Sequence, residues 1–243
     1  MECPKCHHRV AAGSTQCAAC GVVFAKYEEY LEQRAALERE RALRAAEPGF
    51  GARLWSALMT PPEGDRTVWW ARAIAGAALA LWGASYMVRD LYQLGHDPAF
   101  MHAVNLPFHE AGHLVFGIFG DFVGSLGGSL GQLLMPVVCG VALFLRADTF
   151  GCSVCLLWFG ENFLDIAPYM ADARAGELPL LGGNYGKSSP YGFHDWEFIL
   201  GETGLLAWDT TFAAITLNAG RAIMALAMLW GAWLLWRGWR ESV

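Results

Sequence analysis

Residues 105–120 have the sequence NLPFHEAGHLVFGIFG, which places two histidines and a glutamate inside an otherwise apolar segment. His109 and His113 are four residues apart, so on a helix both imidazoles lie on one face and can bind the same metal ion. Glu110 lies beside that face and can hold a water as general base. Because polar groups are costly in lipid, we expect a Zn²⁺ and a wet cavity to gather them. The alternative is a packing cluster of hydrogen-bonded histidines.

The composition favours a membrane protein. Of 243 residues, 55% are hydrophobic and only 16% are charged, whereas about a quarter is usual for soluble domains. The net charge of −6 comes without a basic stripe, which argues against a nucleic-acid partner. We expect an all-α polytopic membrane protein with 4–6 transmembrane helices in contact with the lipid bilayer. The candidate spans are residues 68–88, 106–124, 130–145, 150–171 and 213–236.

Charge placement predicts the orientation. Seven arginines between residues 34 and 72 place the N-terminus in the cytoplasm, and Arg237 and Arg240 keep the C-terminus there. Both ends on one side require an even number of crossings, so one of the five candidates must not cross. The stretch 124–136, GSLGGSLGQLLMP, is glycine-rich and ends in proline, and is expected to be re-entrant. We expect an integral protein of a bacterial inner membrane.

Four cysteines near the N-terminus predict a structural zinc site. They form two Cys-x-x-Cys pairs, CPKC and CAAC, which present four thiolates to one tetrahedral Zn²⁺. The alternative is two disulfides, but no secretory signal peptide opens the chain, which argues against an oxidising compartment. The predicted zinc ligands of this ribbon are Cys3, Cys6, Cys17 and Cys20.

The chain is expected to have three parts. Residues 1–25 form the zinc ribbon. Residues 26–65 form a cytoplasmic charged helix and an amphipathic linker, because Glu and Arg recur at helical spacing before a Pro-Gly stop. Residues 66–243 form the transmembrane, metalloprotease-like domain. The ribbon could also bind a protein partner.

A catalytic zinc needs a third protein ligand. Asp165 and Asp172 are seven residues apart in the fourth candidate span, so both can lie on one helical face. His194 and Asp195 follow in a polar loop, where they could form a lid, provide a ligand or, as is more typical, cap a helix. The residues alone leave the third ligand open among Asp165, Asp172 and His194.

The sequence HEAGH in an apolar helix, followed by a later helix with Asn162, Pro168 and Asp172, resembles the site-2 protease group of intramembrane zinc metalloproteases. The resemblance implies that the two histidines of HEAGH and Asp172 hold a catalytic Zn²⁺. It also implies that Glu110 is the catalytic base and that Asn162 stabilises an oxyanion or positions the substrate.

Three departures from the family pattern N-x-x-P-x-x-P-x-D-G affect this assignment. Asp165 stands in the place of the first proline, the spacing from Asn162 to Asp172 is two residues longer than in the family, and no glycine follows Asp172. The expected function is zinc-dependent hydrolysis of peptide bonds in membrane-embedded or juxtamembrane substrates. The alternative is a non-catalytic membrane scaffold that binds partners through its zinc ribbon. A transporter is less favoured, because the segments show no inverted repeat.

Overall fold

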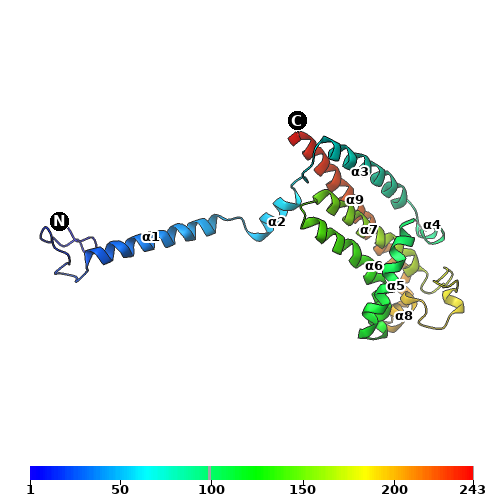
Figure 1. The fold of residues 1–243 in the computed structure, drawn as a ribbon. Coiled ribbons are helices and arrows are strands. Elements are labelled where there is room, and N and C mark those ends of the chain that lie inside the picture. The colour runs from blue at the N-terminus through cyan, green and yellow to red at the C-terminus, as the bar shows by residue number, and fades with distance from the viewer. Residues whose placement is uncertain (98–99, 243) are drawn as a thin grey trace. The chain divides into compact units, whose positions relative to one another are not determined.

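The computed structural model describes residues 1–97 and 100–242, which are mostly helical and contain no strand (Figure 1). The chain divides into two compact units, Met1–Ser56 and Ala57–Val243. The first unit contains the cysteine pairs and helix α1, Phe24–Ala46. Helix α2, Phe50–Leu58, spans the boundary between the units.

Helix α1 has the solvated character that its composition predicts. Its residues are exposed along most of its length, and Arg34 pairs with Glu38 one turn later at 2.9 Å. The ring of Phe24, its first residue, packs against the buried Cys3 and Cys17. The helix therefore starts on the cysteine site, and it ends at Ala46, before Pro48, which cannot continue it.

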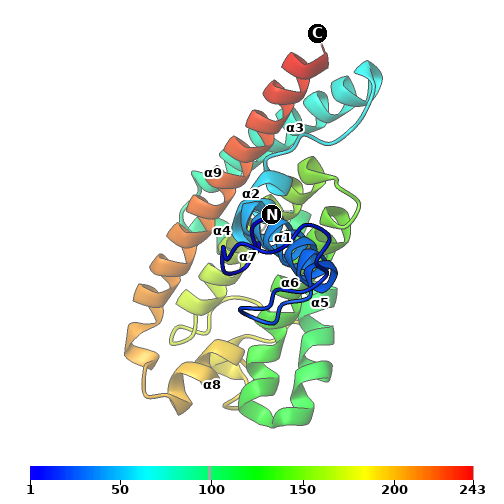
Figure 2. The same ribbon diagram turned by 90° about the vertical axis from the view of Figure 1, so that its left-hand side faces the viewer.

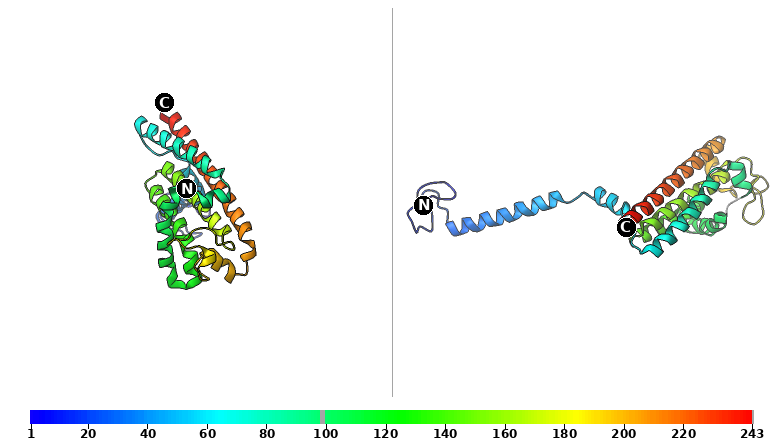
Figure 3. Two further views of the ribbon diagram at one scale, coloured as in Figure 1. Left: turned by 90° about the vertical axis from the view of Figure 1, so that its right-hand side faces the viewer. Right: turned by 90° about the horizontal axis from the view of Figure 1, so that it is seen from above.

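The second unit is a helical bundle built around α7, Thr149–Ala171. Helix α7 is the most buried helix of this unit and packs against α6 and α9 (Figures 2 and 3). The apolar core between α7 and α9 includes Leu164 and Met224. The other helices are α3 (Arg66–Met87), α4 (Leu91–His96), α5 (Phe100–Phe116), α6 (Asp121–Phe144), α8 (Asp195–Glu202) and α9 (Asp209–Ser242).

Three described helices are long and apolar enough to cross a membrane: Asp121–Phe144, Thr149–Ala171 and Leu206–Glu241. The predicted number of 4–6 spans is therefore not confirmed. The expected span 106–124 is interrupted, because α5 has 17 residues and a 3-10 turn and Gly120 separate it from α6. The expected span 68–88 corresponds to α3, whose tryptophans and Arg72 lower its hydropathy.

The expected re-entrant stretch 124–136 is instead part of α6, which runs as one helix from Asp121 to Phe144. Its glycines at positions 124, 127, 128 and 131 follow the i, i+3, i+4, i+7 spacing of one helical face. This face packs on α5: a Cβ added to Gly127 would lie 2.7 Å from the carbonyl oxygen of Gly112. The glycines thus allow two backbones to approach closely, as small residues do between membrane helices.

Candidate functional site

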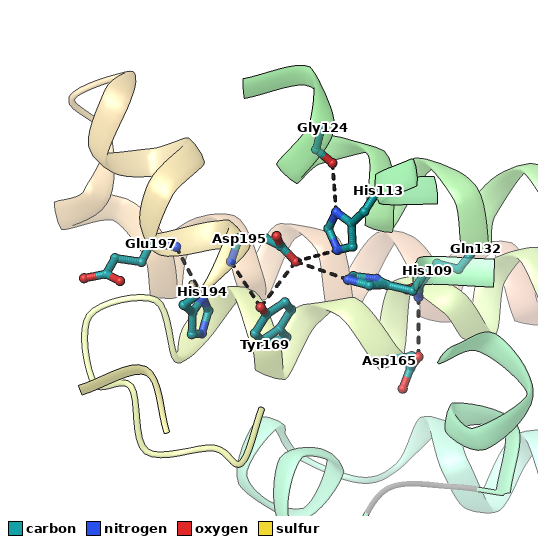
Figure 4. A network of polar contacts seen from close by, with 9 residues as sticks. All are labelled: His109, His113, Gly124, Gln132, Asp165, Tyr169, His194, Asp195 and Glu197. Atoms are coloured by element: carbon teal, nitrogen blue, oxygen red, sulfur yellow. Dashed lines mark hydrogen bonds and ion pairs between the residues drawn. The ribbon is translucent and has the colours of Figure 1, made fainter. Parts of the chain in front are cut away.

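Three metal-ligating side chains converge in the second unit: His109 and His113 of α5, and Asp195, the first residue of α8 (Figure 4). Oδ2 of Asp195 lies 3.1 Å from Nε2 of His109 and 3.4 Å from Nε2 of His113. Ligand atoms held about 2.0–2.1 Å from a tetrahedral zinc lie roughly 3.3–3.4 Å apart. The two distances to Asp195 are compatible with one small tetrahedral ion, and all three ligand atoms lie within 4.8 Å of one another.

Hydrogen bonds at the opposite ring nitrogens fix both imidazoles. Nδ1 of His109 donates to Oε1 of Gln132 at 2.8 Å, and Nδ1 of His113 donates to the carbonyl oxygen of Gly124 at 2.8 Å. A neutral imidazole that donates from Nδ1 carries its lone pair on Nε2. Both lone pairs are thus available on the nitrogens that face Asp195, which is the arrangement a metal requires.

Gln132 is itself oriented. Its Nε2 donates to Oδ2 of Asp165 at 3.4 Å, so the amide cannot rotate without losing one of its two contacts. We expect Gln132→Leu to weaken metal binding to the histidines by about 10–100-fold, the usual effect of removing an outer partner of a metal-bound histidine. Competition with a chelating dye measures the affinity.

The control for Gln132→Leu is Asn218→Leu, which removes an exposed amide that bonds within its own helix, to the Ala214 carbonyl and the Arg221 side chain. It should leave the affinity unchanged. Equal affinities for wild type and Gln132→Leu would contradict the assigned role of Gln132.

The glycine face of α6 makes room for the imidazoles. A Cβ on Gly128 would lie 2.5 Å from Nε2 of His109 and 2.7 Å from Cε1 of His113. Any larger residue at this position would occupy the space in which the two rings meet. The glycine face of α6, which packs on α5, therefore also leaves the space in which the two imidazoles lie.

Asp195 is held in place by Tyr169 and His194. The backbone N–H of Asp195 donates to the Tyr169 hydroxyl oxygen at 3.1 Å, and that hydroxyl lies 3.3 Å from Oδ2 of Asp195. His194 is the N-cap of α8, accepts the N–H of Glu197, and stacks on the Tyr169 ring. Burial raises the pKa of Asp195, but the adjoining imidazoles of His109 and His113 have the larger effect and hold it below its ordinary value. The carboxylate form, which binds metals, is thus favoured.

The cluster lies on the wall of a cavity of about 1050 Å³. Glu110 lines this cavity together with His109, His113 and Asp195. Apolar side chains line much of the remaining wall, among them Leu106, Ile166, Leu178 and Phe198. A carboxylate therefore lies on the same cavity wall as the three possible metal ligands, in a space large enough for a peptide segment.

The structure does not bring Asp165 or Asp172 to the cluster, which corrects the expected third ligand. Asp165 pairs with His102 at 2.8 Å and reaches His109 only through Gln132. Asp172 ends α7 and accepts the backbone N–H groups of Glu177 and Leu178 at 2.8 and 2.9 Å. Each carboxylate is engaged by its own neighbours, so neither is free to reach the ion.

Asn162 is also placed away from the cluster. Its side chain is fully buried, donates to the Trp158 carbonyl of its own helix, and does not line the cavity. The expected oxyanion or positioning role of Asn162 therefore has no support from its position. His194, left open as a ligand, serves as a helix cap beside Asp195.

The four cysteines of the first unit form the second group that could hold a metal ion. Two pairs of sulfurs, Cys3 with Cys20 and Cys6 with Cys17, are each 3.7 Å apart. Sulfurs bound to one tetrahedral zinc at about 2.3 Å lie roughly 3.7–3.8 Å apart. The spacing therefore fits one ion shared by four thiolates.

The two cysteine pairs have matching backbones. His7 and Gly21, the residues after the second cysteine of each pair, both adopt positive φ, at 57° and 74°. Burial opposes ionisation of Cys3, but backbone N–H groups and neighbouring thiols lower the pKa of Cys3 to about 6. The backbone at His8 lowers the pKa of Cys6, yet the neighbouring sulfurs raise it to about 12. Four thiolates this close would repel one another, and a shared cation would offset that repulsion.

No protein-family model, curated protein or solved structure matches this chain. Sequence reasoning passed over Gln132 and Tyr169, and named Asp195 only beside the open candidate His194. The one local signal for Asp195 was its place directly before an amphipathic run, at a helix start.

Proposed function

We propose that this chain is a membrane-embedded zinc metallopeptidase. The observation that carries the proposal is the convergence of His109, His113 and Asp195 at the spacing of a tetrahedral metal, in a cavity that Glu110 also lines. Two imidazoles and one carboxylate leave a fourth position open, which is the ligand set of catalytic rather than structural zinc. Three helices are long and apolar enough to cross a membrane, which supports a membrane location for this chemistry.

A Zn²⁺ held by these three residues would supply a Lewis acid that polarises a peptide carbonyl and makes water a nucleophile near neutral pH. Glu110 accepts the proton of the attacking water and returns it to the nitrogen of the leaving amine. Gln132 and the Gly124 carbonyl keep the histidine Nε2 atoms directed at the position that the ion would occupy. Tyr169 keeps the Asp195 carboxylate beside them.

The proposed substrates are membrane-embedded or juxtamembrane segments of other proteins. The largely apolar cavity wall suits such segments better than strongly charged peptides. The cysteine cluster would bind a second, structural Zn²⁺ and could present the first unit to a protein partner. The proposed location is a bacterial inner membrane, with the N-terminus in the cytoplasm.

Metal removal tests the function directly. We expect purified protein to contain two zinc ions per chain, and a chelator to stop cleavage of a tethered transmembrane reporter. Added Zn²⁺ should restore cleavage. His109→Ala and Cys3→Ser should each reduce the zinc content from two ions to one, because the ligand sets lie in separate units. Elemental analysis and reporter cleavage measure the two results.

Failure of the wild type to cleave any helix in a reporter panel, with both ions bound, would contradict the proposal. That outcome would instead favour the non-catalytic scaffold. Loss of both ions in either single variant would contradict the assignment of two independent metal sites.

A further inference from the structure

A second imidazole–carboxylate pair lies in the same cavity, away from the metal cluster. His102, in the first turn of α5, lines the cavity with about half of its side chain exposed. Its Nδ1 donates to Oδ1 of Asp165 at 2.8 Å. This bond uses one ring nitrogen and leaves Nε2 for a ligand in the cavity.

Asp165 is fixed so that its charge acts on His102. Its carboxylate is 8% exposed, and its other oxygen accepts from Asn105 at 3.3 Å and from Gln132 at 3.4 Å. Asn105 is buried and is itself held by Trp158 Nε1 at 2.8 Å. The hydrogen bond from His102 to Asp165 raises the pKa of His102, against the opposing effect of burial. The imidazolium form, which donates from both nitrogens, is thus more favoured than in a free histidine.

We propose that His102 is a substrate-binding residue, whose Nε2–H donates to a backbone carbonyl oxygen of the peptide in the cavity. The proposal rests on the peptidase function above and adds to it a second point of contact. Asp165, expected from sequence to be a zinc ligand, then has a different part: one oxygen orients His102, and the other orients Gln132 and through it His109.

The spacing fits an extended peptide. His102 and His109 are seven residues apart on one face of α5, which is about 10.5 Å along the helix axis. An extended chain advances roughly 3.3–3.6 Å per residue, so the bound carbonyl lies about three residues from the cleaved bond.

The charges around the cavity favour a neutral carbonyl as the partner of His102. Glu110, Asp121 and Glu177 line the cavity, and within residues 1–97 and 100–242 neither lysine nor arginine does. A carboxylate on the substrate would meet these acidic groups, whereas a backbone carbonyl carries no net charge. His102 would therefore bind a backbone carbonyl, a group that every peptide has.

The test uses a fluorescent reporter peptide and full-length, zinc-loaded protein carrying Glu110→Gln, so that binding is measured without turnover. Adding His102→Leu should weaken peptide binding roughly three- to tenfold, the effect of one hydrogen bond. His102→Gln, which keeps a donor, should restore part of the affinity. In the otherwise wild-type enzyme, His102→Leu should raise KM by a similar factor while kcat and zinc content stay unchanged.

The control is His8→Gln, which changes an exposed histidine in the other unit and should alter neither binding nor KM. Unchanged peptide affinity in His102→Leu would overturn the proposal, as would a fall in kcat at constant KM. Loss of zinc from His102→Leu would overturn it too, because the residue would then act on the metal site. Failure of the peptidase function itself would be seen separately, as absence of cleavage by the wild type.

Discussion

Glu110→Gln will abolish cleavage of a transmembrane reporter while both zinc ions stay bound. Glutamine has nearly the same shape but cannot accept a proton, and the loss of a general base costs about 10²–10⁴-fold in rate. Glu110 is not among the three side chains that converge on the metal position, so metal affinity should not change. Single-turnover cleavage, with elemental analysis of the same preparation, measures both quantities.

The matched control for Glu110→Gln is Glu63→Gln, the same change at an exposed position outside the cavity. It should cleave at the wild-type rate. A Glu110→Gln protein that retains more than about a tenth of the wild-type rate would show that Glu110 is not the base. A protein that loses zinc would show that Glu110 supports the metal site instead.

Gly112→Ala will separate α5 from α6 and weaken both the fold and the metal site. A Cβ at this position would collide with the Gly127 carbonyl, which is backbone and cannot rotate away. Overpacking of this kind typically costs about 1–3 kcal/mol of unfolding free energy, and occasionally more. Because His109 and His113 flank Gly112 on α5, the shift should also weaken zinc binding. Thermal unfolding in detergent and zinc affinity measure the two effects.

Gly140→Ala provides the comparison within α6. Its added Cβ would meet only Cys155 Cβ, at an ordinary contact distance of 3.5 Å. In a helix interior alanine is favoured over glycine by up to about 1 kcal/mol, so this variant should unfold at the same temperature as wild type or higher. Equal stability of Gly112→Ala and Gly140→Ala would contradict the close packing of α5 on α6.

Local patterns in the sequence could predict the local parts of the two sites. The i, i+4 spacing sets His109 and His113 on one face, and the two Cys-x-x-Cys pairs indicate one four-thiolate group, because each pattern needs only short-range geometry. Asp195 lies 86 residues from His109, and no periodicity relates a helix to a residue that arrives through a long polar loop. Its proximity is a result of tertiary packing.

The glycine-rich stretch 124–136 shows why other expectations failed. Glycine weakens an isolated helix, so composition favoured a broken, re-entrant segment. In the bundle, the absence of side chains at these four glycines lets α5 and its histidines approach α6 closely. Asp165 was wrongly predicted as a zinc ligand for a related reason. The sequence placed it correctly on a buried helix, but its partner is His102, which the sequence did not single out.

The long separation of Asp195 from the two histidines has a consequence for biogenesis. The helix hairpin that carries the imidazoles is contiguous in the chain, whereas the carboxylate is synthesised much later and joins only when α8 docks. A nascent or half-inserted chain therefore lacks a complete set of ligands. On the proposed function, peptidase activity would therefore arise only once α8 has docked on the earlier helices.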